Sequence, residues 1–111
     1  MKRVNRLTSS SDFRRTLARG RRSAAGSVVA TCAVGGAAPA RVGVSASKRV
    51  GNAVQRNRVK RLMRVAASDA LLAIPDGTDV ILTAKPGAYG KPYQVIAADV
   101  KAALKKVGVP C

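Results

Sequence analysis

Residues 56–64, RNRVKRLMR, bring four arginines and one lysine together with no acid among them. In a helix, Arg56, Lys60 and Arg64 would form one stripe at intervals of four residues. Asn57 and Arg61 would form a second stripe beside it. Like charges at this spacing destabilise a helix by about 0.2–0.5 kcal/mol per pair, whereas guanidinium groups bind phosphate oxygens through paired hydrogen bonds. The pattern therefore predicts a helix face that is neutralised by the phosphates of a polyanion.

An ordinary solvated helix face is the alternative interpretation. Such faces normally mix both signs of charge, but Arg58 adds further positive charge and the next acid is Asp69. Asn57 either contacts a base edge or a ribose hydroxyl, or makes a local contact on the helix, and the sequence leaves both open. Lys48 and Arg49 precede the helix start, where unpaired amides and the helix dipole attract anions.

Positive charge is concentrated in the first part of the chain. The 111 residues include 21 Lys and Arg against 5 acids, all of them Asp, for a net charge of +16. Residues 1–64 hold sixteen of the cations and one acid, Asp12, whereas residues 65–111 hold five lysines and four aspartates. Charge kept for solubility would intersperse both signs. With 47% hydrophobic residues the chain should fold, so the uneven charge indicates a basic surface for a polyanion.

The residue types argue against a catalytic centre made of protein groups. The chain has no His and no Glu, so it lacks the usual bases that activate a nucleophile, and its scattered aspartates do not suggest a protein-held metal pair. Cys32 and Cys111 are predicted to be reduced thiols, since they form no disulfide framework. No apolar run is long enough to span a membrane, and the stretch MKRVNRLTSSSDF has a charged start but lacks the hydrophobic stretch of a signal peptide, so we expect a cytoplasmic protein.

The element that carries the first acid is predicted to be a short helix. In the stretch TSSSDFRRTLARG, Ser10 or Ser11 can cap the helix and Gly20 can end it. Phe13 and Leu17 are four residues apart and share one face of this helix.

The rest of the chain alternates between strand-like and helix-like segments. Strands are predicted at residues 27–34, 41–47 and 78–84, the last an apolar strand buried on both faces. A middle helix capped by Asn52 should run to about residue 72, and a final helix should cover residues 93–107. The helix residues expected to face the sheet are Val59, Leu62, Met63, Ala66, Ala70, Ile96, Val100, Leu104 and Val107. We therefore predict one α+β domain over residues 1–111, an α/β sandwich in the order helix, two or three strands, helix, strand, helix, and we take three strands, one of them without an assigned range, as the prediction.

The block RVGVSASKRVGNAVQRNRVKRLMR, residues 41–64, closely resembles the signature of the bacterial ribonuclease P protein subunit. That family reads as a strand ending in S-K-[KR]-x-G-N-A-V, followed by an R-N-R-x-K-R run. The resemblance extends upstream through NRL at residues 5–7, DF at residues 12–13 and Gly20. It implies a single ribonuclease P protein domain with the ribosomal-protein-like fold, in which parallel strands are joined by a left-handed crossover. General connection rules would favour a right-handed one.

The resemblance also implies a function. The family's protein binds the catalytic RNA of ribonuclease P and the 5′ leader of precursor tRNA, and assists endonucleolytic removal of the leader to form the mature tRNA 5′ end. The catalytic centre then belongs to the RNA, with Mg²⁺ held mainly by RNA, and no organic cofactor, membrane or obligate protein partner is implied. A structural ribosomal RNA-binding protein with a similar sandwich is the alternative.

The family's functional positions can be transferred residue by residue. Those implied to contact the catalytic RNA are Lys48, Arg49, Asn52, Arg56, Asn57, Arg58, Lys60, Arg61 and Arg64. Those implied to line the leader-binding cleft are Phe13, Leu17 and Ala30. Leu17 and Ala30 stand where the family often has aromatic residues, so leader binding here is expected to depend more on charge and shape than on base stacking. Phe13 is alternatively a plain core residue, and Tyr89 and Tyr93 are expected to pack in a loop and at a helix start.

Overall fold

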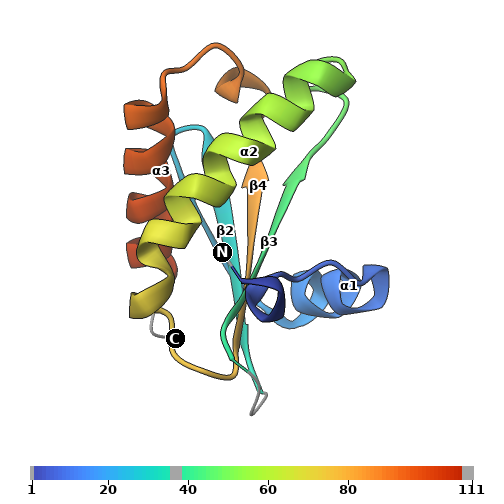
Figure 1. Ribbon diagram of the computed structural model, residues 1–111, viewed down its shortest axis with the longest axis vertical. Helices are drawn as coiled ribbons and strands as arrows, with labels where there is room; N and C mark the ends of the chain where they lie inside the picture. Colours follow the sequence, from blue (N-terminus) through green and yellow to red (C-terminus); the bar gives the residue numbers. More distant parts are fainter. Residues whose placement is uncertain (1, 36–38, 109–111) are drawn as a thin grey trace.

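A mixed four-stranded sheet organises the chain (Figure 1). The computed structural model describes residues 2–35 and 39–108. The strands are β1 (Arg21–Ala25), β2 (Val28–Val34), β3 (Arg41–Ala46) and β4 (Thr78–Ala84). They lie in the order β1-β2-β4-β3, with β1–β2 and β2–β4 antiparallel and β3–β4 parallel.

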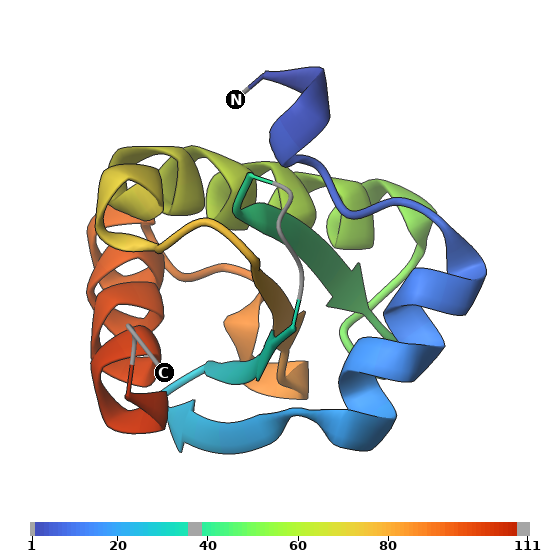
Figure 2. The same ribbon diagram turned by 90° about the horizontal axis from the view of Figure 1, so that it is seen from below.

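Three α-helices flank the sheet. They are α1 (Ser10–Arg19), α2 (Ala53–Ala70) and α3 (Tyr93–Val107), accompanied by the short 3₁₀ turns η1 (Arg3–Asn5), η2 (Leu71–Ala73) and η3 (Pro86–Ala88). α2 and α3 cover one face of the sheet and α1 lies against the other (Figure 2). The predicted α+β class and the order with three strands before α2 are confirmed, but β1 lies in a segment for which no strand range was predicted.

The connection from β3 to β4 has the unusual hand that the resemblance implies. In Figure 1 the chain runs up β3, returns downward through α2 in front of the sheet, and rises again through β4 on the left of β3. A right-handed crossover with its helix in front would have moved to the right. The connection is therefore left-handed, and it places α2 across the sheet face beside the edge formed by β3.

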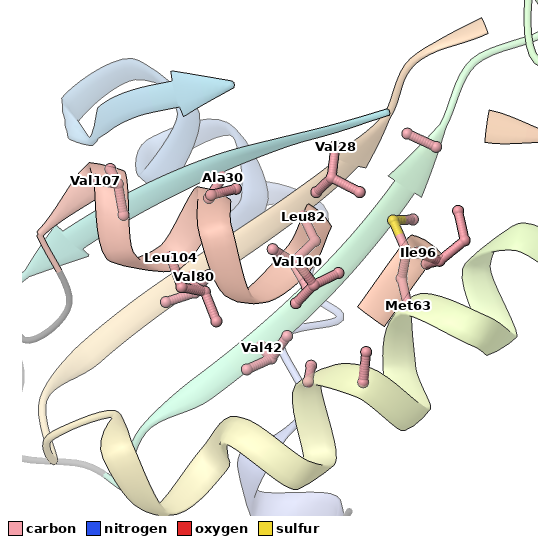
Figure 3. Packing of buried hydrophobic residues seen from close by; sticks show 14 of the residues in the cluster. Val28, Ala30, Val42, Met63, Val80, Leu82, Ile96, Val100, Leu104 and Val107 are labelled. Carbon is pink, nitrogen blue, oxygen red and sulfur yellow. The ribbon is translucent and has the colours of Figure 1, made fainter. Parts of the chain in front are cut away.

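The core lies between the sheet and the helices α2 and α3 (Figure 3). All four residues predicted to face the sheet from α3 are buried, and so are Val59, Met63 and Ala66 of α2. Leu62 and Ala70 are only partly buried but pack against the same cluster. Each large apolar side chain buried in this way stabilises the fold by about 1.5–3 kcal/mol, so the apolar stripe of α2 fixes which of its sides faces outward.

Helix ends follow their capping residues. α3 covers the predicted range and ends at Gly108, whose φ of 83° is left-handed. α1 is capped by Ser9, whose side chain accepts a hydrogen bond from the amide of Asp12, so the prediction of Ser10 or Ser11 as the cap is wrong. Three consecutive serines are chemically equal candidates for this position, and only the backbone geometry distinguishes them.

Cys32 is a second correction. It is buried on β2 and is disulfide-bonded, whereas we predicted a reduced thiol. Cys111 lies outside the described residues. The bonding of Cys32 depends on the three-dimensional fold, which spacing along the chain does not reveal.

Candidate nucleic-acid interface

The start of α2 is fixed by a reciprocal pair of hydrogen bonds. The Asn52 side-chain oxygen accepts from the Gln55 amide at 2.9 Å, and the Gln55 side-chain oxygen accepts from the Asn52 amide at 2.8 Å. This capping box satisfies two amides at the end of the helix. The side chain of Gln55 occupies the space in which a Cβ at residue 51 would lie, so Gly51 is needed for this contact.

The predicted cations of α2 point away from the core. Arg58, Arg61 and Arg64 are exposed together with Asn57, whereas Arg56 and Lys60 are half-buried. Over residues 2–35 and 39–108, every ion pair involves Asp12 or Asp79, and none involves a cation of α2. Within the described residues, the positive charge of this helix is therefore not neutralised by ion pairs.

The loop before α2 extends this basic surface. Lys48 and Arg49 are exposed in a turn closed by a hydrogen bond of 3.0 Å from the Val50 amide to the Ser47 carbonyl. Asn52 lies next to them, but its side-chain oxygen is used by the cap of α2. The NH₂ group of the Asn52 side chain therefore remains available to donate a hydrogen bond to a ligand.

A cleft of about 650 Å³ lies where α2, β3, α1 and the N-terminal segment meet. Its lining residues are Arg6, Leu7, Thr8, Phe13, Val42, Gly43, Val44, Arg61, Arg64, Val65, Ser68 and Asp69. The cleft joins Phe13, expected to contact the leader, with Arg61 and Arg64, expected to contact the catalytic RNA. The sequence had placed these residues in two separate groups.

Phe13 is seated directly on the backbone of β3. A Cβ added to Gly43 would lie 2.5 Å from Cε2 and 2.6 Å from Cζ of the Phe13 ring. The ring is half-buried and one part of it lines the cleft. The two alternatives for Phe13 therefore describe two sides of one residue, because the ring both packs on the sheet and borders the cleft.

Arg6 is a cleft residue that the sequence reasoning missed. The segment that carries it runs beside β3, where the Leu7 amide donates to the Val42 carbonyl at 2.9 Å and the Asn5 side chain donates to the Ala40 carbonyl at 2.8 Å. Leu7 is 2% exposed, and it holds the segment down while Arg6 remains exposed. The NRL motif at residues 5–7, which the resemblance included, was the available signal for this anchor.

Ala30 does not line the cleft, and its assignment there is corrected. Side chains alternate along a strand, and Ala30 shares the face of Val28 and Cys32, which lie in the core beneath α3. Ala30 is fully buried there. Val29 and Thr31, the neighbours of Ala30 on the strand, lie on the opposite face of the sheet, toward α1. Leu17 is 42% exposed on α1, one turn after Phe13, and it is not among the residues that line the cleft.

Arg41 differs from the arginines of α2 because it is held by two carboxylates. Its Nε and Nη2 donate to the two oxygens of Asp79 at 2.9 and 2.8 Å, and its Nη1 donates to Asp12 at 3.1 Å. The hydrogen bonds to Asp79 raise the pKa of Arg41, and the one to Asp12 adds to this effect. The charge of Arg41 thus ties α1 to β3 and β4.

Two further polar contacts hold α3 in place. Asp99 accepts hydrogen bonds from the hydroxyl of Ser27 at 2.6 Å and from its amide at 2.9 Å, and these lower the pKa of Asp99. Tyr93, the first residue of α3, donates to Asp69 at 3.3 Å. Partial desolvation and the negative charge of Asp69 raise the pKa of Tyr93.

In the part of the chain that the structure describes, no three His, Cys, Asp or Glu side chains gather in a way that could hold a metal ion. Nor does that part contain a helix with the length and hydropathy needed to cross a membrane.

Comparisons with known proteins agree on one family. A family model described as ribonuclease P matches residues 1–108. The chain is similar to the ribonuclease P protein component of Clavibacter michiganensis, with 34% identity covering 94% of this chain and 93% of that protein. It is similar to that of Kocuria rhizophila, with 36% identity covering 90% and 88%. The Staphylococcus aureus RNase P protein structure superposes with a TM-score of 0.84 at 28% identity, covering 95% of this chain and 96% of that one.

Proposed function

Because the chain belongs to the ribonuclease P protein family, we propose that it is the RNA-binding subunit that assists removal of the 5′ leader from precursor tRNA. It takes part in an endoribonuclease complex. The proposal that the chain binds RNA rests on one observation. Within the described residues, the cations of α2 form no ion pairs with carboxylates of the same chain. These cations border a cleft that contains an aromatic ring.

The catalytic RNA is assigned to the outer surface of α2 and the loop before it. A bound phosphate backbone removes the repulsion between cations that lie three or four residues apart, and arginine forks grip phosphate oxygens in pairs. The residues assigned to this surface are Lys48, Arg49, Asn52, Arg56, Asn57, Arg58, Lys60, Arg61 and Arg64. Neutralising phosphates at this point also lowers the repulsion between the catalytic RNA and its RNA substrate.

The leader of precursor tRNA is assigned to the cleft. Phe13 lines the cleft and is half-buried, so its ring is available to a base, and base–aromatic stacking contributes about 1–3 kcal/mol per base. Leu17 and Ala30 add no aromatic surface, and Ala30 is buried in the core. Leader binding therefore rests on the cations of the cleft and its shape, with one stacking residue.

Cleavage is assigned to the RNA partner. The complex is assigned to the cytoplasm. Phosphodiester hydrolysis by a protein-held metal pair needs grouped carboxylates, and the described residues do not group them. The residues present therefore do not fit a protein-held Mg²⁺ site, and the ions that the family requires are assigned to RNA phosphates. The chain's own contribution is to bind, neutralise and orient the two RNAs.

Reconstitution with a bacterial ribonuclease P RNA tests this proposal. Cleavage of a precursor tRNA is measured at low Mg²⁺ concentration with and without the protein, because screening by the protein replaces part of the screening by ions. We expect faster cleavage and tighter substrate binding with the protein. If the protein does not speed cleavage and binds a ribosomal RNA fragment more tightly than it binds the ribonuclease P RNA, the result would support the structural ribosomal alternative instead.

A further inference from the structure

A second run of arginines lies outside both the basic surface of α2 and the cleft. Residues 13–34 hold five arginines and no acid. All five are exposed: Arg14, Arg15, Arg19, Arg21 and Arg22. We call them the α1–β1 surface, because three of them belong to α1 and two to the strand that follows it.

The α1–β1 surface lies at the edge of the sheet opposite α2. The strand order β1-β2-β4-β3 makes β1 and β3 the two outer strands, separated by three spacings of about 4.8 Å. α2 packs on β3, and Figure 2 shows β1 (light blue) along the margin of the molecule opposite α2. An RNA segment bound to α2 therefore leaves the α1–β1 surface free for another segment.

The junction between α1 and β1 is fixed by Gly20. Its amide donates to the Thr16 carbonyl at 2.8 Å. A Cβ added at this position would lie 2.7 Å from Cγ2 of Thr31 and 2.9 Å from the carbonyl oxygen of Cys32, so the turn packs closely against β2 without room for a side chain. The arginines on either side of Gly20 are therefore held on a fixed backbone, and such preorganisation lowers the cost of binding.

α1 separates this surface from the cleft. At about 100° per residue, Phe13 lies on one flank of the helix, and Arg15 and Arg19 lie on the other. The buried side chain of Thr16 lies between the two flanks. Arg15 and Arg19 border a small pocket of about 240 Å³ beside α1, and neither lines the larger cleft that contains Phe13. An RNA on the α1–β1 surface is thus distinct from a leader in the cleft.

Most of the charge on this surface is not used within the fold. Among the described residues, Arg15 pairs with Asp12 at 3.0 Å, and no ion pair involves the other four arginines. Charge kept for solubility would mix both signs. Arg19 follows Arg15 by four residues, so the two cations repel each other on α1. A bound polyanion would remove this repulsion.

The surface offers cations without a platform for bases. Residues 14–25 include no aromatic residue, and β1 continues after its two arginines with the small residues Ser23, Ala24 and Ala25. Single-stranded RNA is bound chiefly by stacking its bases on aromatic side chains, whereas duplex RNA presents phosphates and ribose hydroxyls. The chemistry of the α1–β1 surface therefore fits the backbone of an RNA double helix.

We propose that the α1–β1 surface binds the phosphate backbone of a double-helical segment of the catalytic RNA, while α2 binds a different segment of the same RNA. This inference rests on the proposed function. The catalytic RNA is favoured over precursor tRNA because the leader of the substrate is assigned to the other flank of α1. Two contacts at opposite edges of the sheet hold one RNA more tightly than either contact alone, because the second contact forms intramolecularly.

The test compares two triple variants that lose the same charge. The test variant carries Arg19→Ala, Arg21→Ala and Arg22→Ala. The control variant replaces three exposed lysines outside the surface, with Lys85→Ala, Lys101→Ala and Lys105→Ala. Filter binding of each full-length protein to a bacterial ribonuclease P RNA is measured across a salt series. The test variant should bind about thirtyfold more weakly, with a log–log salt slope lower by roughly 2–3, and the control should change far less.

Hydroxyl-radical cleavage of the RNA backbone locates the contact. The wild-type protein should protect two separate sets of nucleotides. The test variant should lose protection of one set, which consists of base-paired nucleotides, and Arg58→Ala on α2 should weaken protection of the other. Circular dichroism monitors folding. If the triple variant unfolds, the single variants Arg19→Ala and Arg22→Ala, each expected to bind about threefold more weakly, repeat the comparison.

The outcomes separate this inference from the proposed function. Loss of protection at unpaired nucleotides, or at the set that depends on Arg58, would overturn the inference, as would equal salt slopes for the test and control variants. Weaker binding of precursor tRNA to the assembled complex, with unchanged affinity for the catalytic RNA, would assign the surface to the substrate and overturn it too. If the wild-type protein does not bind the catalytic RNA, the proposed function itself fails.

Discussion

Arg41 and the arginines of α2 carry the same guanidinium group in opposite settings. Arg41 donates three hydrogen bonds to two carboxylates, and its side chain is 28% exposed. Arg58, Arg61 and Arg64 project from α2, and within residues 2–35 and 39–108 no carboxylate pairs with them. Arg41 lies on β3, the strand that precedes α2, and residues 41–64 contain no acid, so the contrast does not come from local composition.

The difference separates the charge that builds the fold from the charge that serves a partner. A paired arginine joins elements that are distant in sequence, here α1 with β3 and β4. Unpaired arginines on one helix repel one another and make isolated α2 slightly less stable. That cost is recovered when an RNA backbone supplies the opposite charge, so removing cations from the two regions should have opposite consequences.

Removing the cations of α2 that lie outside the cleft should have the largest effect. The triple variant Arg56→Ala, Arg58→Ala and Lys60→Ala should bind the catalytic RNA about a hundredfold more weakly, at roughly 1 kcal/mol per lost contact. Filter binding across a salt series measures this affinity, and the salt slope should become shallower. Thermal unfolding should show unchanged or slightly raised stability, because repulsion within the helix is relieved. A loss of stability matching the loss of affinity would contradict the distinction.

Removing Arg41 should chiefly affect folding. Arg41→Ala leaves Asp79 unpaired and takes one partner from Asp12. Because these ion pairs are partly exposed, the free energy of unfolding should fall by about 1–2 kcal/mol. Urea denaturation measures the change. Arg15→Ala is the matched control, because Arg15 also pairs with Asp12 but its side chain is 58% exposed, and it should cost less than about 0.5 kcal/mol. Equal losses in both variants would mean that Arg41 does not join the elements.

The contact between Asp99 and Ser27 should give the smallest effect, visible through pH. Because hydrogen bonds from Ser27 lower the pKa of Asp99 in the folded state, the folded protein binds this proton less readily than the unfolded chain. The contact therefore stabilises the fold above the usual Asp pKa near 4, and this stability is lost as pH falls through the lowered value.

Asp99→Asn should remove this part of the pH dependence and cost up to about 1 kcal/mol near neutral pH. Unfolding followed by circular dichroism from pH 7 to pH 3 measures it, and Asp76→Asn, at an exposed position, serves as the control. Identical profiles for wild type and Asp99→Asn would show that the contact adds nothing to stability.

Local patterns predicted most of the fold. α3 and β4 have the predicted bounds, because apolar periodicity and flanking breakers act within a few residues. Asn52 was predicted as the cap of α2 for the same reason. The errors have a different origin: Ala30 was assigned by position in a family pattern without considering strand parity, and the bonding of Cys32 depends on tertiary proximity.

The candidate site was predicted in part. The types and outward direction of the α2 cations followed from sequence spacing alone. The meeting of Phe13 with Arg61 and Arg64 in one cleft did not, because it depends on how α1 and α2 dock on β3 from different sides. Arg6 was missed because its position is set by hydrogen bonds between the N-terminal segment and β3. Such contacts between distant residues leave no helical or strand periodicity in the sequence.

The N-terminal segment that carries Arg6 has one more consequence. β3 is the last strand of the sheet, and a bare outermost strand is a template on which foreign chains assemble. By taking the carbonyl of Val42, Leu7 occupies part of that template. The N-terminal segment therefore shields part of this edge from pairing with another chain, which lowers the tendency of the protein to aggregate.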